Sequence, residues 1–392
     1  MSYTRREFGK LALAGLPAAA LLGRTESIFG AFAQAKPNSL INGVQIGTIT
    51  YSYRSMPDQT AEATLKHIVD SGISAIELMG GPVESFAGAP QSAGRGGGGG
   101  RGPAGAAGGR GPGDAGGTTA AGAAPAAATG AAPVGSWNGQ PCSAGRGGGG
   151  APGGGGGRGE ITPEQRAQQE EQAAKLKAWR TSVSMDAFKK LRKMYNDAGV
   201  TIYAWKQLNP NMSDDEFDYV FNVAEALGCT HTTLELPTDA AQLRRIGDFG
   251  MKHKVYAAYH THLQGSMTAF DQAFAASKGN MANIDFGHFV AAGNVGGTPM
   301  QFLQKYHDRI SSFHLKDRTS PEHCSLNLAW GTGDTPIKEI LQLVSKNKWK
   351  IPGSIELEYD IPEGSDAVKE VRRCVEFCRT ALGAGSSSAP AR

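Results

Sequence analysis

The sequence has no excess of charge of either sign, and it has few cysteines. Its 392 residues include 39 Lys and Arg against 36 Asp and Glu, a net charge of +3. This even balance gives no sign of a strongly acidic or basic partner. The five cysteines, Cys142, Cys229, Cys324, Cys374 and Cys378, form no CxxC zinc motif, and their odd number and irregular spacing do not indicate a disulfide framework. We interpret Cys374 and Cys378, one helical turn apart, as two small apolar contacts rather than a bridge.

The sequence also lacks an apolar run long enough to span a membrane comfortably. The run from Leu11 to Leu22 is short and contains Gly and Pro. Because it follows the pair Arg5 and Arg6, it resembles a twin-arginine export signal, and the small residues of AFAQA (31–35) offer a cleavage site. We therefore expect residues 1–35 to direct export to the periplasm or beyond, with an uncleaved anchor as the alternative. We expect no stable membrane span in the mature form.

Glycine is the residue that the sequence has in excess, with 55 copies. Many of them fall between residues 87 and 159, together with Ala, Pro and scattered Arg. Such a segment has no large side chains to bury, so we expect a long disordered insertion there and a disordered tail at 385–392. RNA binding by the arginines is the alternative to an expanded surface loop, and the scarcity of aromatic residues favours the loop.

Outside this tract, β-branched and aromatic stretches alternate with helical ones. We predict strands at 44–53, 73–80, 200–205, 230–237, 254–262, 283–289, 310–317 and 353–360. Thr162 and Pro163 predict the start of the first helix after the tract, and Gly199 the end of the second. Eight βα units predict an α/β fold, a (β/α)8 TIM barrel formed as a single domain by residues 36–384, with the insertion after strand two.

Polar side chains occur at the C-terminal end of nearly every predicted strand, where the active sites of such barrels lie. These residues are Tyr51, Tyr53, Glu77, Trp205, Lys206, Glu235, His260, His262, Asp285, His288, His314, Lys316, Asp317, Glu356 and Glu358. His260 and His262 lie two apart on one strand, so they share a face. Mixed histidine and carboxylate donors suit one divalent ion of Mn, Co, Zn, Mg or Fe better than a closed structural zinc site.

Four motifs, taken in order, resemble the xylose isomerase-like TIM-barrel family, which comprises sugar phosphate isomerases/epimerases and AP endonuclease family 2 (endonuclease IV) relatives. They are IDFGH after strand six, FHLKDR on strand seven, WGTGDTP after it and IELEYD on strand eight. The resemblance covers the chain from residue 36 apart from the glycine tract. It implies a divalent metal held by residues that correspond here to His260, Asp285, His314 and Glu358.

One of these four residues departs from the family pattern, because the family has Glu where this chain has His260. That Glu is also one of two proton-transfer carboxylates, so the departure puts symmetrical two-carboxylate epimerisation in doubt. Glu358 remains a candidate catalytic carboxylate, with Glu235 and Lys206 as candidates for the second acid/base role. Two choices stay open at this point. His262 could replace His260 as the ligand, and Glu356 shares a face with Glu358.

Five of the strand-end residues, together with Trp330, are predicted to contact substrate. This set comprises His262, His288, Lys316, Asp317, Glu77 and Trp330, and the tryptophan could stack on a sugar face. The glycine turn GTGD (331–334) could cradle a phosphate, but we favour a role in starting the next helix.

Together these features predict a metal-dependent sugar isomerase or epimerase, or a keto-sugar (keto-glycoside) lyase. A base would remove the proton α to a metal-polarised carbonyl and give an enediolate. Export favours free sugars, keto-sugars or glycosides over phosphorylated ones as the carbohydrate substrate. One alternative is an endonuclease IV-like phosphodiesterase. Strands one to three disfavour it because they offer Tyr, Glu and Lys instead of the His ligands of such enzymes. The small net charge also disfavours binding to nucleic acid. The other is a non-catalytic sugar-binding barrel. A homo-oligomer is possible.

Overall fold

The computed structural model describes residues 36–90, 135–142 and 162–384. The predicted export signal (1–35), most of the predicted insertion and the tail (385–392) lie outside the described residues. The chain divides into two units, 1–36 and 37–392, and the fold below is that of the second unit.

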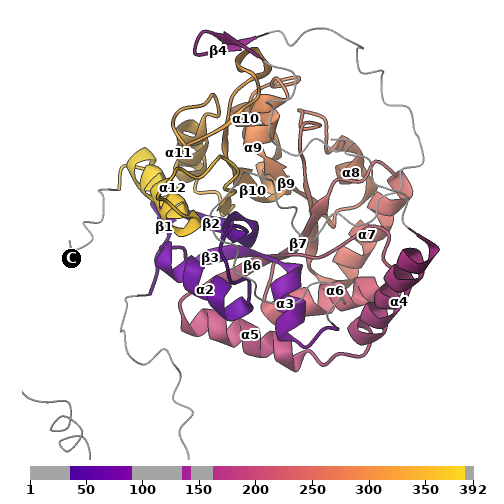
Figure 1. Cartoon of the computed structure of the whole chain (residues 1–392). Helices are drawn as coiled ribbons and strands as arrows, with labels where there is room; N and C mark the ends of the chain where they lie inside the picture. The colour runs from indigo at the N-terminus through magenta and orange to yellow at the C-terminus, as the bar shows by residue number, and fades with distance from the viewer. Residues whose placement is uncertain (1–35, 91–134, 143–161, 385–392) are drawn as a thin grey trace, which may run out of the picture. The chain divides into compact units, whose positions relative to one another are not determined.

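Eight parallel strands of this unit form one closed sheet (Figure 1). They are β2 (Val44–Ile49), β3 (Ala75–Met79), β6 (Thr201–Lys206), β7 (His231–Glu235), β8 (Tyr256–His260), β9 (Asn280–Asp285), β10 (Ile310–Leu315) and β13 (Gly353–Ile355). Their order is β2-β13-β10-β9-β8-β7-β6-β3, and the pairing of Thr48 with Ile76 joins β2 to β3. The last pairing closes the sheet, so the predicted (β/α)8 barrel is confirmed.

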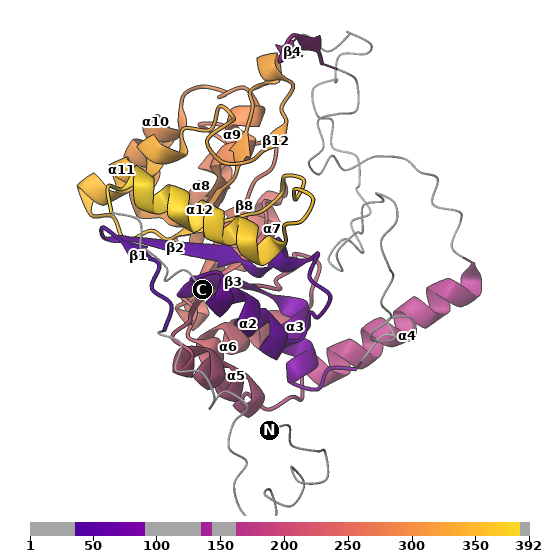
Figure 2. The same cartoon turned by 60° about the vertical axis from the view of Figure 1, so that its left-hand side comes forward.

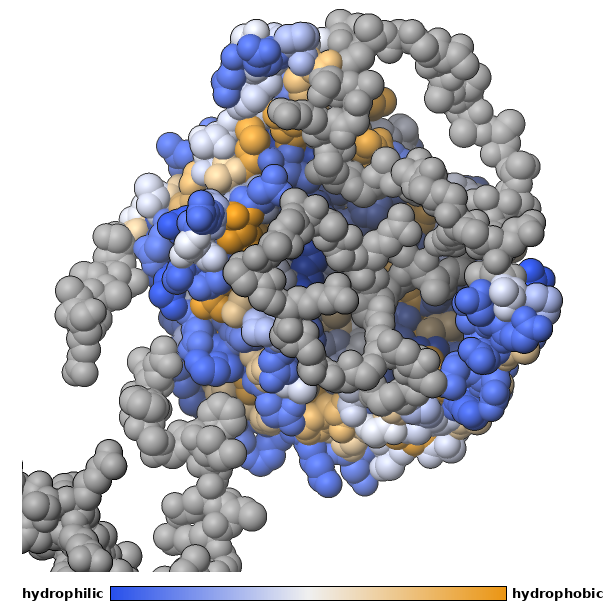
Figure 3. Space-filling view, viewed as in Figure 1, coloured by the Kyte–Doolittle hydropathy of each residue, from blue (hydrophilic) through white to orange (hydrophobic). Residues whose placement is uncertain are grey.

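Helices surround the barrel on its outer side (Figures 1 and 2). They are α2 (Ala61–Asp70), α3 (Gly80–Phe86), α4 (Pro163–Arg180), α5 (Asp186–Asp197), α6 (Asp214–Leu227), α7 (Ala240–His253), α8 (Asp271–Ala276), α9 (Phe286–Ala291), α10 (Pro299–Tyr306), α11 (Ile337–Asn347) and α12 (Ala367–Ala381). Thr162 and Gln165 form a capping box at the start of α4, with Pro163 at its first position, as predicted. No residue of α4 is buried, and Figure 3 shows it largely hydrophilic at the right-hand side.

Three strands, β2, β9 and β13, end at least four residues earlier than predicted, each for a local reason. β2 ends at Ile49 because residues 50–53 form the 3-10 turn η1 (Thr50–Tyr53). β9 ends at Asp285, because this side chain accepts a hydrogen bond from His288 N and so starts α9. The strand expected at 283–289 is therefore half strand and half helix. β13 is limited to Gly353–Ile355, so Glu356 and Glu358 follow the strand instead of lying on it.

The apolar core lies between the sheet and the helices, while the interior of the barrel is largely polar. Phe188, Phe217 and Phe302 are fully buried on the helical side of the sheet. Inside the barrel, Tyr203 stacks on His231 with ring centroids 5.9 Å apart. A side chain at Gly47 would lie 2.8 Å from Tyr203 Cε1, so only glycine leaves room for this ring. This buried polar interior lies next to the strand ends that carry the site.

A short hairpin within the predicted insertion is joined to the barrel by a disulfide. The hairpin pairs β4 (Ser136–Trp137) with β5 (Gln140–Pro141), and Cys142 next to it is bonded to Cys324, 182 residues away. Cys324 ends the 3-10 turn η3 (Pro321–His323), between two short antiparallel strands, β11 (Asp317–Arg318) and β12 (Asn327–Leu328). The odd number and irregular spacing of the cysteines did not indicate this bond, because the fold brings together two residues whose spacing carries no signal.

Cys374 and Cys378 are free, buried thiols on α12, as expected of apolar contacts, and Cys229 is likewise free and buried. Two further short elements complete the described chain: β1 (Leu40–Ile41), antiparallel to β2, and the 3-10 turn η2 (His307–Arg309). In the part of the chain that the structure describes, no helix is both long and apolar enough to cross a membrane.

Candidate active site

Asp285 and His288 owe their spacing to the start of α9. Asp285 Oδ1 accepts a hydrogen bond from His288 N at 2.8 Å, which uses one carboxylate oxygen to cap the helix. The other oxygen, Oδ2, is buried and lies 3.0 Å from Lys316 Nζ, but it accepts no hydrogen bond of regular geometry within the described residues. Between the two residues, a side chain at Gly287 would lie 2.3 Å from Lys316 Cγ. In the motif D-x-G-H, Asp285 Oδ2 therefore faces Lys316, and the absence of a side chain at Gly287 leaves room for Lys316.

His314, at the end of β10, lies between two carboxylates. Its Nε2 is 2.7 Å from Glu77 Oε2 and its Nδ1 is 3.0 Å from Glu356 Oε2. Burial acts to lower the pKa of His314, but the two carboxylates override it and raise the pKa to about 10. In return, and against the effect of its own burial, Glu77 has a pKa lowered to about 2. The imidazole is thus held in one orientation by charge on both sides.

Glu77 lies beneath His314 and not at the mouth of the barrel, where a substrate contact was expected. It is fully buried, and Thr233 donates to its Oε1 at 2.6 Å. Asn283 donates to its Oε2 at 3.0 Å and to Ser312 Oγ at 2.9 Å. Both oxygens of Glu77 are therefore engaged by the protein, and this carboxylate positions His314 from below.

His260 ends β8 beside His314, with ring centroids 4.6 Å apart. Its Nδ1 faces Asn283 Oδ1 at 3.4 Å. Burial, together with the charge of His314, lowers the pKa of His260 to about 3, so the ring is neutral at neutral pH. A neutral imidazole has one nitrogen lone pair available, which is the form that binds a metal.

Donor atoms of four buried residues lie within 4.8 Å of one another, namely His260, Asp285, His314 and Glu356. Three of these are the predicted ligands of strands five to seven. At the end of strand eight, Glu356 belongs to the cluster, whereas Glu358 Oε2 lies 2.6 Å from Lys316 Nζ. Two imidazoles and two carboxylates form a donor set that fits a divalent metal ion with mixed nitrogen and oxygen ligands, and His314 would release a proton to join it.

Lys316 lies among the carboxylates of this cluster. Its Nζ is 3.0 Å from Asp285 Oδ2, 2.7 Å from Glu356 Oε2 and 2.6 Å from Glu358 Oε2. Burial opposes the charge on Lys316, but the three carboxylates outweigh it and raise the pKa of the ammonium. The ammonium neutralises part of the negative charge that these carboxylates would otherwise place side by side.

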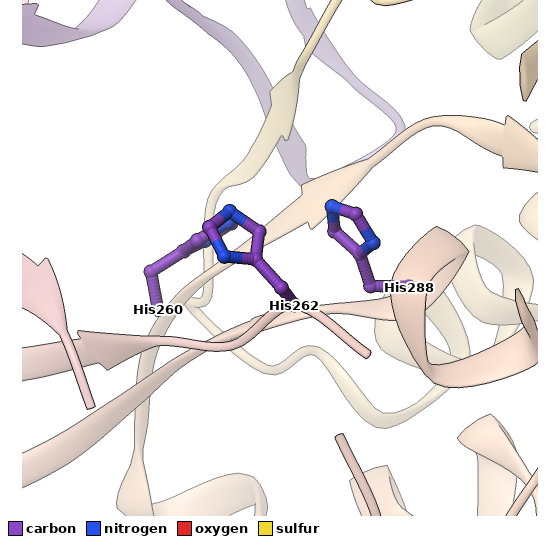
Figure 4. Close-up of side chains that lie close together, drawn as sticks. All are labelled: His260, His262 and His288. Atoms are coloured by element: carbon purple, nitrogen blue, oxygen red, sulfur yellow. The ribbon is translucent and has the colours of Figure 1, made fainter. Parts of the chain in front are cut away.

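The predicted substrate contacts His262 and His288 lie next to His260 (Figure 4). The ring centroid of His262 is 5.0 Å from that of His260 and 4.8 Å from that of His288. The side chain of His262 is 41% exposed, so it is the member of the trio that solvent can reach. Donor atoms of these three residues also lie within 4.8 Å of one another, which makes them a second group that could hold a metal.

Lys206 and Glu235 form an ion pair at the ends of β6 and β7, with Nζ and Oε1 2.9 Å apart. Although burial acts against ionisation, Lys206 and the neighbouring His260 and His262 lower the pKa of Glu235 to about 2. The side chain of Glu235 is half exposed, and His262 Nδ1 lies 3.5 Å from its Oε2. This pair is therefore accessible from the mouth of the barrel.

Asp317 and Trp330 lie away from the cluster. Asp317 Oδ2 accepts hydrogen bonds from the backbone N–H groups of Gly331, Thr332 and Gly333 at 2.7–3.0 Å. The glycine turn thus binds an anion that belongs to its own loop, and α11 begins three residues after it. Trp330 packs edge-on against Phe377 of α12 at 5.7 Å. Neither side chain has a contact that ties it to the four-donor cluster.

Arg318 is a site residue that the sequence analysis did not select. Its Nη1 donates to His288 Nδ1 at 2.6 Å, and the side chain is one of the largest fully buried ones in the described chain. A signal for it was present. In the run His314, Lys316, Arg318, the residues recur at every second position, which points them to the same face of an extended segment.

Comparisons with known proteins give similar folds only. No family model matches the chain, and none of the curated proteins does. Among solved structures, a sugar phosphate isomerase/epimerase from Parabacteroides distasonis is 14% identical, covering 88% of this chain and 96% of its own, with a TM-score of 0.49. A probable 3-DHS dehydratase involved in petrobactin synthesis, from Bacillus anthracis, is 10% identical over 85% of this chain and 98% of its own, with the same score.

A xylose isomerase domain protein from Planctomyces limnophilus is 15% identical, covers 51% of this chain and 84% of its own, and has a TM-score of 0.41. The neighbours thus include xylose isomerase-like barrels and sugar phosphate isomerases/epimerases. The assignment of the fold rests on the strand pairing described above.

Proposed function

We propose that this protein is a metal-dependent sugar isomerase or epimerase, or a keto-sugar lyase, that removes a proton from the carbon next to a carbonyl group. The observation that carries the proposal is the cluster of His260, Asp285, His314 and Glu356. All four are buried at the ends of four consecutive strands, where barrels of this kind hold their active sites. Asp285 Oδ2 lies 3.0 Å from the Lys316 ammonium but accepts no regular hydrogen bond among the described residues, so it retains a lone pair for a ligand.

The four donors would hold one divalent ion, with Glu358 as the alternative to Glu356. When bound, this ion supplies a Lewis acid that polarises a carbonyl group and orients neighbouring oxygens. Glu77 holds His314 from the side opposite Glu356, which fixes the imidazole before any ligand arrives. The burial of the four donors limits the access of water to the metal site.

Two accessible carboxylates, Glu358 and Glu235, are candidates for the proton transfers. Glu358 follows β13 and Glu235 ends β7, and three strands separate β13 from β7 in either direction around the barrel. They therefore lie on opposite sides of the barrel mouth. Epimerisation requires this arrangement, because one group removes a proton from one face of the substrate carbon and another returns a proton to the opposite face. Lys206, paired with Glu235, would donate to a substrate oxygen on that side.

The first test is elemental analysis of the purified protein dialysed against Mn²⁺ or Zn²⁺, beside His260→Ala and Asp285→Ala. We expect about one ion per chain in the wild type and at least a tenfold loss in both variants. His67→Ala on α2 and Asp186→Ala on α5 are matched controls on helices outside the sheet and should keep the metal. An unchanged metal content in His260→Ala and Asp285→Ala would contradict the site.

The second test is exchange of α-protons of free keto-sugars in deuterated water, followed by NMR. We expect exchange by the metal-loaded wild type and at least a 100-fold slower rate in Glu358→Gln. Metal binding without exchange for any sugar would favour the non-catalytic sugar-binding barrel instead.

We also propose that the protein works in an oxidising compartment, which the predicted export signal would give it. The support is the Cys142–Cys324 bond, because disulfides persist mainly outside the cytoplasm. Thiol titration of the unfolded, unreduced protein from its native compartment should give three free thiols, those of Cys229, Cys374 and Cys378. Five free thiols would contradict this location.

A further inference from the structure

Ser52 has a buried hydroxyl that makes two hydrogen bonds to one short segment, at the end of β13. The residue is 1% exposed and belongs to the 3-10 turn η1. Ser52 Oγ donates to the backbone oxygen of Ile355 at 3.1 Å, and it accepts from the backbone N–H of Leu357 at 3.0 Å. Both directions are fixed, because a carbonyl oxygen only accepts and a backbone N–H only donates. This one hydroxyl therefore spans the backbone of the residue between them, Glu356.

The two bonds of Ser52 replace strand pairing that β2 does not supply. β2 pairs with β13 as far as Thr48 and Ile355, and the chain then turns into η1. On the other side of Glu356 the pairing continues, because its N–H donates to the backbone oxygen of Leu315 on β10 at 3.0 Å. Ser52 supplies the hydrogen bonds on the β2 side. The backbone of Glu356 is therefore held from both sides, one residue beyond the end of β13.

The neighbouring carboxylate, Glu358, lies beyond the two bonds of Ser52. Glu356 Oε2 lies 3.0 Å from His314 Nδ1, and its side chain is 8% exposed. The side chain of Glu358 is 19% exposed, and Glu356 is the one of the two that belongs to the four-donor cluster. The hydrogen bonds of Ser52 thus separate a carboxylate that is held inside the cluster from one nearer the mouth of the barrel.

We propose that Ser52 is a positioning residue that makes Glu356, and not Glu358, the metal-binding carboxylate at the end of β13. When the backbone on either side of a ligand is already fixed, less conformational freedom is lost on binding, so the affinity is higher. Glu358 then remains available to the substrate. The metal role rests on the proposed function, whereas the coupling between Ser52 and Glu356 is a property of the metal-free protein.

The first arm of the test measures Mn²⁺ affinity by calorimetric titration of the full chain carrying Ser52→Ala. We expect the dissociation constant to rise about tenfold or more, as for other residues that orient a metal ligand. Thr48→Val is the matched control, because Thr48 Oγ1 donates to the same backbone oxygen of Ile355 at 3.0 Å and makes no hydrogen bond to Leu357 within the described chain. Its dissociation constant should stay within about twofold of the wild-type value.

Unchanged affinity in Ser52→Ala, or an equal loss in Thr48→Val, overturns the proposal. Ser52→Cys is the second variant, because it nearly keeps the volume of the buried side chain but has a weak donor and acceptor. Mn²⁺ prefers oxygen ligands, so the new thiol does not compete for it. We expect a loss of affinity of a few-fold, smaller than in Ser52→Ala. If Ser52→Ala does not fold, unchanged affinity in Ser52→Cys overturns the proposal.

The second arm needs no metal. It compares the unfolding equilibrium constants, measured in denaturant, of metal-free Ser52→Ala, Glu356→Gln and the double variant. Because Ser52 acts through Glu356, the constant of the double variant should be at least about threefold smaller than the product of the two single effects predicts. With Glu358→Gln in place of Glu356→Gln, the two effects should multiply within about twofold. Independent effects of Ser52→Ala and Glu356→Gln, or equal coupling with Glu358→Gln, overturn the assignment.

The two arms separate this inference from the function on which it rests. The expected coupling together with no Mn²⁺ binding by the wild type would support Ser52 as the residue that positions Glu356, and would overturn its metal role along with the proposed function. Mn²⁺ binding that Ser52→Ala leaves unchanged would support the proposed metal site and overturn the role of Ser52.

Discussion

The two halves of the barrel place the same kinds of residue at their strand ends for different purposes. The second half, β8 to β13, supplies the four clustered donors. The first half supplies two glutamates, Glu77 on β3 and Glu235 on β7. Glu77 is fully buried and bonded to three protein groups, whereas the side chain of Glu235 is half exposed and paired with Lys206. A glutamate at a strand end can therefore support a ligand from below or meet the substrate, depending on its depth.

The largest effect is expected from Glu77→Gln. This variant keeps the shape of the side chain but removes the charge that holds His314, so the free energy of unfolding should fall by about 3 kcal/mol. Metal affinity should fall roughly 10–100-fold because the orienting partner of a ligand is weakened. Denaturant unfolding and calorimetric metal titration measure the two effects.

Glu84→Gln is the matched control, because Glu84 is also buried and paired, with Arg180, but on α3 outside the barrel. It should lose stability and keep the metal affinity. Equal metal affinity in Glu77→Gln and the wild type would remove the distinction between the supporting and the accessible glutamate.

The next effect is an acid-dependent loss of stability that comes from the interior of the barrel. Burial lowers the pKa of His231 to about 4, while an unfolded chain has the ordinary value near ~6.5. Below about pH 6.5 the unfolded state binds a proton that the folded state does not, so stability falls as the pH drops toward 4 and is constant above ~6.5. The total contribution is about 3 kcal/mol.

His231→Gln isolates this term when the unfolding free energies of the metal-free wild type and variant are compared from pH 8 to about 4. Their difference should be flat above about pH 6.5 and should change in favour of the variant below it. A difference that is independent of pH would show that His231 titrates alike in both states.

A smaller effect is expected from Thr233→Val, which removes the hydrogen bond to Glu77 Oε1. The free energy of unfolding should fall by about 1–2 kcal/mol, and metal affinity should weaken a few-fold. Thr232→Val on the same strand removes a comparable bond to the backbone oxygen of Trp205. If Thr232→Val weakened metal binding as much, the support from Glu77 would not be specific.

The smallest effect on stability is expected from Glu235→Gln. The ion pair with Lys206 is open to solvent on the glutamate side, so the free energy of unfolding should change by less than about 1 kcal/mol. Metal content should stay the same, while α-proton exchange falls at least about tenfold if Glu235 transfers a proton. Unchanged exchange would leave Glu358 as the single proton-transfer carboxylate.

The fold was predictable because eight strand and helix patterns repeat along the chain, and parallel βα units have few ways to close. Closure then brings His260, Asp285 and His314 together, since strand ends meet at one rim. The choice between Glu356 and Glu358 was not predictable. Their shared face would apply only if the strand continued, but β13 ends at Ile355 and the chain turns.

The sequence by itself thus determined the barrel, the rim on which the site lies and most of its donors, because all three follow from local periodicity. Only the tertiary structure decided the depth of Glu77, the bond between Cys142 and Cys324, and the contact of Arg318 with His288. Each of these depends on distances between residues far apart in the chain or on which hydrogen-bond partners surround a buried side chain. No pattern of residue types along a sequence records those quantities.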